Sequence, residues 1–130
     1  MATKKITFDP EAGVAYAANF VMLGGANFEG NFEVVGTSNT AFNLEGYSGS
    51  SQMTKSVSIG STAFPAATFA VGFTSAADGK VRISLGGTQT KLLEEGRYVY
   101  DVIVSSGNTF YRLVDGNILV QPGISSISAL

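Results

Sequence analysis

A hairpin near the C-terminal end decides the fold, and over residues 96–114 it reads GRYVYDVIVSSGNTFYRLV. Its first half alternates between apolar and more polar residues, which predicts a half-buried strand with one inward series, Tyr98, Tyr100, Val102 and Val104. Residues 105–108 have the composition of a turn, and residues 110–114 form the returning strand. The pair Asp115-Gly116 then turns or bulges the chain into residues 117–121, so a three-stranded meander is expected.

The same alternation recurs upstream of this hairpin. Two apolar-alternating runs, 69–73 and 81–85, flank the turn signal Asp78-Gly79 and predict a second hairpin. A further half-buried strand is expected over residues 28–34, with the inward series Phe28, Phe32 and Val34. The strand that contains Met53, Lys55 and Val57 is more polar, and a position at the edge of the sheet is expected for it.

The rest of the chain is less regular. Residues 5–8 predict a short strand and residues 9–13 a turn. Residues 14–23 are apolar on both faces, so periodicity leaves helix and strand open, and Gly24-Gly25 ends the segment in either case. The connector 42–47 is expected to cap the core with its apolar residues.

One short helix is expected over residues 88–95. Thr88 is the candidate N-cap, Leu92 and Leu93 are the apolar anchor, and Gly96 stands where a helix stop is favoured. A helix of this length depends on tertiary contacts.

Short strands at spacings of about 8 to 12 residues are typical of an all-β protein, and they favour a β-sandwich, with a small closed barrel as the alternative. Composition agrees, because only 14% of the residues are charged and the chain has 16 glycines but 3 prolines. The 130 residues are interpreted as an N-terminal arm with the first strands (1–26), a β-sandwich core (27–123) and a C-terminal tail (124–130).

Charge and residue usage exclude several functional classes. The 8 basic and 10 acidic residues are scattered singly, so no basic patch indicates nucleic acid or an anionic membrane as a partner. Cysteine and histidine are both absent, which excludes disulfides, thiolate or imidazole metal sites and the usual neutral-pH proton carrier. Residues 1–8 lack the apolar run of a signal peptide, and no segment approaches the about 20 apolar residues of a membrane helix. A cytosolic product is expected.

No catalytic, cofactor-binding or metal-binding residue is predicted. A carboxylate pair of the glycosidase type is conceivable in Glu94-Glu95, or in Asp101 with Asp115. The first pair belongs to a surface helix, and Asp115 stands where a turn favours aspartate. We interpret Asp101 as a partly buried charge in a structural ion pair with one of three arginines, Arg97, Arg112 or Arg82.

Five motifs follow one another along most of the chain: FNLEGY (42–47), QMTK (52–55), GKVRISL (79–85), GRYVYDV (96–102) and GNILVQPG (116–123). In this order they resemble small structural proteins of tailed bacteriophages, in particular those of marine and cyanobacterial phages, and the immunoglobulin-like N-terminal domains of phage upper baseplate proteins. The resemblance implies an immunoglobulin-like β-sandwich of about seven to eight antiparallel strands with one short helix. It carries no catalytic residues. The segment before Asn27 is longer than the family's first strand, which leaves open an arm that grips a neighbouring subunit.

Two functions from different classes are expected from these observations. The first is a non-enzymatic virion structural protein, made in the host cytoplasm and built into the neck, tail, baseplate or head surface. It would assemble through its ends and edges with other phage structural proteins and with copies of itself. The alternative is a carbohydrate- or ligand-binding β-sandwich with Tyr47, Tyr111 and loop asparagines in a shallow site, which the absence of tryptophan weakens.

Overall fold

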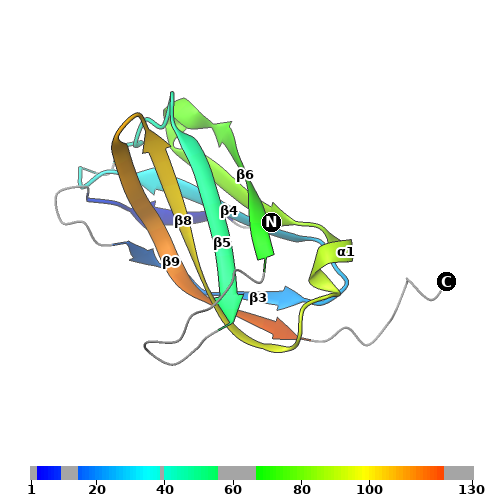
Figure 1. Ribbon diagram of the computed structural model, residues 1–130. Helices are drawn as coiled ribbons and strands as arrows, with labels where there is room; N and C mark the ends of the chain where they lie inside the picture. Colours follow the sequence, from blue (N-terminus) through cyan, green and yellow to red (C-terminus); the bar gives the residue numbers. More distant parts are fainter. Residues whose placement is uncertain (1–2, 10–14, 39, 56–66, 122–130) are drawn as a thin grey trace.

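Figure 1 shows the computed structural model of the chain, which describes residues 3–9, 15–38, 40–55 and 67–121. In these residues the regular structure consists of nine strands, the 3-10 helix η1 (Ala76–Asp78) and the short α-helix α1 (Gly87–Thr90). The strands are β1 (Thr3–Thr7), β2 (Tyr16–Ala17), β3 (Phe20–Leu23), β4 (Phe28–Val35), β5 (Ser48–Lys55), β6 (Ala67–Ser75), β7 (Lys80–Leu85), β8 (Gly96–Ser106) and β9 (Thr109–Gln121). The prediction of a nearly all-β chain with little helix is confirmed.

The described strands form one sheet in the order β1-β4-β7-β6-β5-β8-β9-β2, with β3 also paired to β9. The sheet curls over so that β5, β8 and β9 lie across β4, and it is nearly barrel-shaped (Figure 1). Strand β6 pairs with β5 on one side and with β7 on the other, so the two halves are continuous where two separate sheets were expected.

Three strand pairs are parallel, although antiparallel pairing was expected throughout. They are β1 with β4, β2 with β9, and β3 with β9. The N-terminal strands lie far from these partners in the sequence, so no hairpin turn dictates an antiparallel arrangement. The ambiguous segment 14–23 therefore contributes strands, β2 and β3, rather than a helix.

The core fills the space between the two halves of the curled sheet. The inward series expected on β4 and β8 is buried, namely Phe28, Phe32, Val34, Tyr98, Tyr100, Val102 and Val104. Five aromatic rings meet at the centre with neighbouring centroids 5.4–6.5 Å apart, Phe20, Phe28, Phe32, Phe69 and Tyr100. Tilted and edge-to-face contacts of this kind stabilise a core beyond the area that they bury.

The C-terminal hairpin is longer and simpler than expected. Strand β9 runs without interruption from Thr109 to Gln121, so the expected three-stranded meander is a two-stranded hairpin. Asp115-Gly116 neither turns nor bulges the chain, and the register instead shifts at Leu113, where β9 has one more residue than β8. This strand position requires glycine, because a Cβ atom there would overlap the carbonyl oxygen of Ala18, which crosses close to it.

Strand β5 lies between β6 and β8, so the expectation of an edge strand is wrong. Its small residues fit closely between the neighbouring strands. Ser51 is buried and its hydroxyl donates a 2.6 Å hydrogen bond to the Asp101 carbonyl oxygen, and a Cβ atom at Gly49 would overlap the Val71 side chain. Met53 is buried and Lys55 is exposed, and Val57 falls outside the described residues.

The predicted second hairpin is confirmed, with β6 and β7 joined through η1 and Gly79, whose φ of 71° suits glycine. The predicted helix is shorter than expected, because α1 covers only Gly87–Thr90 and begins after Gly86 without a side-chain cap from Thr88. Leu92 is 78% exposed, so it is not an anchor, whereas Leu93 packs against the core.

The connector 42–47 caps one end of the core as expected. Leu44 is fully buried, and Phe42 and Tyr47 pack against the buried cluster. The short strand predicted at residues 5–8 is confirmed as β1, with Ile6 buried and Phe8 buried directly after it. Most of the predicted turn at 9–13 and all of the predicted tail at 124–130 fall outside the described residues.

Candidate functional site

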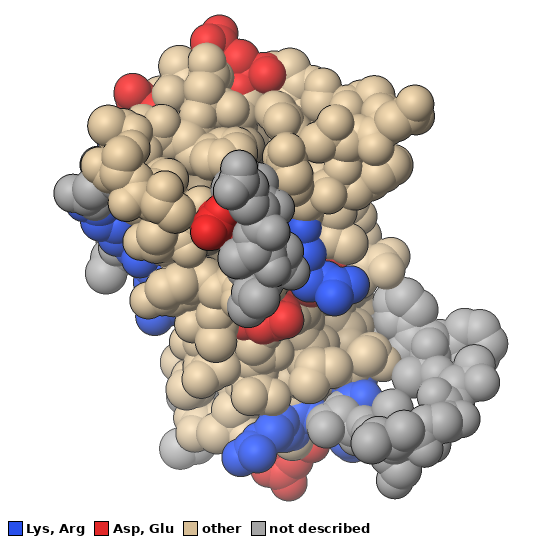
Figure 2. Space-filling model, turned by 90° about the vertical axis from the view of Figure 1, so that its left-hand side faces the viewer, with Lys and Arg blue, Asp and Glu red and all other residues tan. Residues whose placement is uncertain are grey.

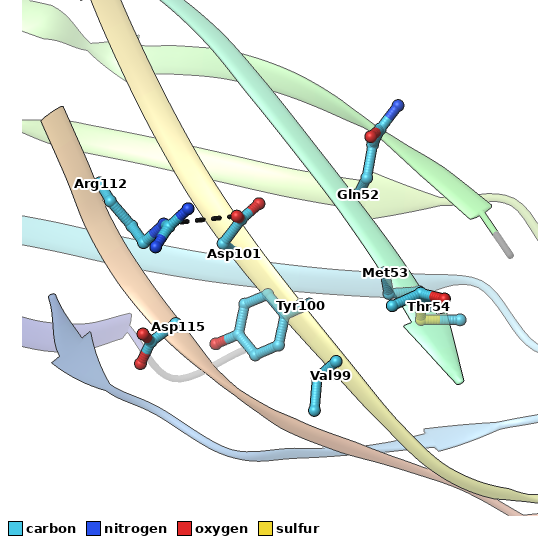
Figure 3. A pocket seen from close by; sticks show the side chains of 8 residues that line it. All are labelled: Gln52, Met53, Thr54, Val99, Tyr100, Asp101, Arg112 and Asp115. Atoms are coloured by element: carbon cyan, nitrogen blue, oxygen red, sulfur yellow. Dashed lines mark ion pairs between the residues drawn. The ribbon is translucent and has the colours of Figure 1, made fainter. Parts of the chain in front are cut away.

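The outer face of the sheet carries a shallow hollow of about 310 Å³ over β5, β8 and β9. Figure 3 shows Arg112 on β9 reaching toward Asp101 on β8, with Asp115 further along β9 and Gln52 on β5. The strand register places Asp101 directly opposite Asp115 on one side and Gln52 on the other. The hollow therefore forms where the pairing of three strands brings these side chains next to one another on one face of the sheet.

Asp101 is the half-buried charge of this hollow. Its Oδ2 lies 3.4 Å from Nε of Arg112, and its side chain is 33% exposed. This confirms the predicted ion pair and selects Arg112 from the three candidate arginines, since Arg82 pairs with Glu29 on β4. Burial raises the pKa of the Asp101 carboxyl, the Arg112 guanidinium opposes the rise, and the charge of Asp115 adds to it.

Tyr100 lies beneath the hollow and faces the core. Its hydroxyl donates a 2.7 Å hydrogen bond to the Ala18 carbonyl oxygen, which joins β8 to the link between β2 and β3. Burial is the main cause that raises the pKa of this hydroxyl, and the charge of Asp115 adds to it. Tyr100 therefore stays protonated at physiological pH and acts as a structural donor.

The carboxylates considered for chemistry have structural surroundings. Glu94 lies after α1 with its Oε2 2.9 Å from Nζ of Lys55, and its side chain is 81% exposed. Asp101 and Asp115 do meet across β8 and β9, but Arg112 already neutralises the first of them. Among the described residues no three acidic side chains gather as a metal site would need, and no helix is long and apolar enough to span a membrane.

An aromatic cluster lies where the connector 42–47 meets β9. Tyr47 and Tyr111, the residues proposed for a sugar site, do come together, with ring centroids 6.2 Å apart and planes at 26°. Tyr111 also contacts Phe8 and Phe42 edge-to-face. Tyr111 is therefore packed by three rings, of which Phe8 is the nearest with centroids 5.3 Å apart, and Tyr47 stacks on the same tyrosine.

The two ends of the curled sheet expose very different strands. At one end, β1 carries Lys4 and Lys5, and Nζ of Lys4 lies 5.2 Å from the ring centroid of Phe20 on β3. At the other end, β3 consists of four apolar residues, Phe20 to Leu23. The sheet ends at these strands within the described residues, because β1 pairs only with β4 and β3 pairs only with β9.

The outward face of β3 forms an apolar stripe with β9, defined by Val21, Leu23 and Leu119. Val21 and Leu23 are 55% and 54% exposed, and Leu119, which stands opposite Val21 in the register, is 41% exposed. Met22 between them points inward and is buried. Sequence reasoning missed this stripe, although the signal was present in a segment that is apolar on both faces.

Charged side chains gather in a few small groups on the face shown in Figure 2, and much of the surface between them is uncharged. Such a surface creates little long-range electrostatic repulsion. It offers no extended basic area on this face either.

Comparisons with known proteins identify a shared fold. The N-terminal domain of phage TP901-1 ORF48 aligns with a TM-score of 0.52 at 11% identity, over 93% of this chain and 99% of that one. A family 123 glycoside hydrolase from Clostridium perfringens gives a TM-score of 0.41 at 9% identity, over 88% of this chain and 24% of the enzyme chain, and is too distant to support an argument. No protein-family model and no curated protein matches the sequence.

Proposed function

We propose that this chain is a non-enzymatic structural protein of a tailed-phage virion, a building block of the neck, tail, baseplate or head surface. The observation that carries the proposal is the likeness to a phage protein domain, which extends over 93% of this chain and 99% of that one. A match across nearly the whole of both chains indicates the same unit rather than a shared hairpin. The five motifs that resemble phage structural proteins point independently in the same direction.

The proposal includes the finer architecture. An immunoglobulin-like sandwich would place β5, β8 and β9 in one layer and β1, β4 and β7 in the other, with β6 continuing between them. The ring cluster around Phe20 and Tyr100 fills the space between these layers. In this interpretation the barrel-like closure arises because the N-terminal strands join both ends of the sheet.

The proposed partners are other phage structural proteins and copies of this chain, without nucleic acid or membrane. The formal net charge of −2 and the scattered basic residues support this choice, because binding to phosphate backbones needs clustered Lys and Arg. A passive role agrees with the surroundings of Asp101, whose carboxylate is paired with Arg112 rather than poised for proton transfer.

Mass spectrometry of density-purified phage particles tests the proposal. The chain is expected in the particles at a fixed ratio to the major structural proteins, and immunogold labelling would locate it on the neck, tail, baseplate or head. A replication protein of the same phage is the matched control, because it should be lost on purification. Absence of the chain from particles that retain infectivity would overturn the proposal.

Carbohydrate binding is the second candidate, and it rests on the proximity of Tyr47 and Tyr111. A glycan array probed with the wild-type protein and with Tyr47→Ala tests it. Signals that disappear in Tyr47→Ala but persist in Phe110→Ala would support a sugar site, since Phe110 is an exposed aromatic residue next to Tyr111. A silent array rejects this candidate and leaves the virion proposal untouched.

A further inference from the structure

We propose that β3 is a self-association edge, at which one copy of this chain binds β3 of a second copy as an antiparallel strand. This goes beyond the proposed function, because it names a surface and an occupant and does not depend on where in a virion the chain resides. The strand has an outer edge that no other described strand pairs with. Such an edge presents unpaired backbone groups that can bind another strand.

The first support is that the sequence of β3 contains nothing that would block pairing with another strand. Proteins protect their edges by keeping the edge strand very short, or with lysine, proline, a bulge or an inward-pointing charge. Strand β3 is short, with four residues, and Lys4 of β1 lies over its Phe20 ring, but the strand itself has no charge or proline and its register with β9 is regular. Its outward residues Val21 and Leu23 are more than half exposed, at 55% and 54%.

The second support is that the stripe is self-complementary. An antiparallel pair centred on Met22 and its copy places Val21 opposite Leu23 of the second chain, and the reverse, as a two-fold axis requires. The two stripes of Val21, Leu23 and Leu119 would then form one continuous apolar surface across both sheets. No charged residue lies on β3, so this pairing brings no like charges together.

The third support is the lack of a better partner edge among the described strands. The edge of β1 carries Lys4 and Lys5, and β2 has only two residues. Pairing of β1 with its own copy would bring four lysines together, and such like-charge contacts are unfavourable. Strand β3 is therefore the edge that best fits a second copy.

The small size of the stripe sets the expected strength. A stable dimer interface buries about 800 Å² on each partner, which three half-exposed aliphatic side chains and a four-residue strand do not reach. The contact is therefore expected to be weak in solution, with a dissociation constant on the order of 0.1–1 mM. Many such contacts in one assembly would act together.

Sedimentation velocity over a concentration series from about 10 µM to about 1 mM tests the proposal, a range chosen to span the expected dissociation constant. The wild-type sedimentation coefficient is expected to rise toward that of a dimer at the highest concentrations. The double variant Val21→Lys with Leu23→Lys should remain monomeric throughout. The matched control is Leu92→Lys with Phe110→Lys, which replaces two exposed apolar residues elsewhere and should associate as the wild type does.

Disulfide trapping provides a second readout that does not depend on the lysine variants. The chain has no cysteine, so Val21→Cys and Leu23→Cys each introduce a single thiol. A mixture of the two variants should form the 21–23 disulfide-linked dimer at least several-fold faster than either variant alone. Equal rates in all three samples, or a wild type that stays monomeric at the highest concentration, would overturn the proposal.

Discussion

Strands β1 and β3 are the two ends of one sheet, and they differ in almost every property that governs an edge. Both come from the N-terminal segment and both pair in parallel with a long strand, β1 with β4 and β3 with β9. Strand β1 carries two lysines, Lys4 and Lys5, which are both exposed, and charged side chains of this kind on an edge strand disfavour further pairing. Strand β3 carries none. The comparison predicts that β1 resists pairing with a further strand and that β3 accepts one.

The two edges are also attached differently. Strand β1 has five register pairs with β4 and is anchored by Ile6 and by Phe8 directly after it, which are both buried. Strand β3 depends on the short link before it, residues 18–19, which is held by hydrogen bonds to β8 and β9. Changes at that link should therefore affect the β3 edge and leave β1 in place.

The largest effect is expected for Gly116→Ala, which adds a Cβ atom against the carbonyl oxygen of Ala18. Because the obstacle is backbone, either β9 or the link to β3 must move, and we expect a loss on the order of 2–4 kcal/mol in unfolding free energy. Chemical denaturation measures it. Self-association through β3 should weaken at the same time, because a shift of the link at residues 18–19 would disturb the pairing of β3 with β9.

Gly72→Ala is the matched control for this substitution. Gly72 also lies within a strand, but a Cβ atom there would meet open space. Its unfolding free energy should stay within about 0.5 kcal/mol of the wild type. A similar loss in both variants would show that glycine matters in these strands for a reason other than the close approach of Ala18.

A smaller loss of stability is expected for Tyr100→Phe. This substitution removes the 2.7 Å hydrogen bond to Ala18 and leaves the buried carbonyl oxygen of Ala18 without that donor. We expect a decrease of about 1–2 kcal/mol in unfolding free energy. Tyr98→Phe is the control, because its hydroxyl bonds to the Glu94 carbonyl oxygen in a less buried place. Hydrogen exchange of the β3 amides should accelerate in Tyr100→Phe alone, and unchanged exchange would contradict the role given to this bond.

The edge of β1 can be made able to pair with another strand by removing its charges. Replacing Lys4 and Lys5 by valine removes both charges from β1 and should create a second weak association edge, seen by sedimentation as species larger than a dimer. Stability should fall by no more than about 1 kcal/mol through the loss of the Lys4 contact with Phe20. Valine at Lys80 and Lys91, two exposed lysines elsewhere, should leave the assembly size unchanged.

Much of this fold could be predicted from local pattern, because strands with one buried face have a period of two. That rule correctly identified the inward residues of β4 and β8 and the hairpin around Gly79. It also placed Asp101 between apolar neighbours on a strand, close enough to an arginine to pair. Each of these features depends on residues near one another in the sequence or on directly adjacent strands.

The errors occur where a distant segment decides the structure. Asp115-Gly116 has turn chemistry, but the crossing of Ala18 holds it in a strand, and nothing near residue 115 reports that contact. Strand β5 has the polar sequence of an edge strand, yet it lies between β6 and β8, where Ser51 is buried and hydrogen-bonded to the Asp101 carbonyl oxygen. The exposed stripe on β3 was missed for the same reason, since only the sheet order reveals that the strand is at an end.

The smallest effect is expected at the middle of the sheet, where neither edge is involved. Because burial raises the pKa of Asp101, the folded state binds its proton more readily than the unfolded chain between the ordinary aspartate value, about 4, and the raised one. Stability due to this group therefore falls as pH rises through that window.

Asp101→Asn should abolish this dependence and leave stability at pH 7 unchanged or higher by less than about 1 kcal/mol, as measured by denaturation across the acid range. Asp115→Asn removes a charge that raises the pKa of Asp101. It should therefore narrow the pH range over which stability changes, but the effect of burial should remain. A marked loss of stability in Asp101→Asn at pH 7 would mean that the pair with Arg112 outweighs the burial of the carboxylate. Association through β3 should be the same in both variants, because the carboxylates lie away from the apolar stripe.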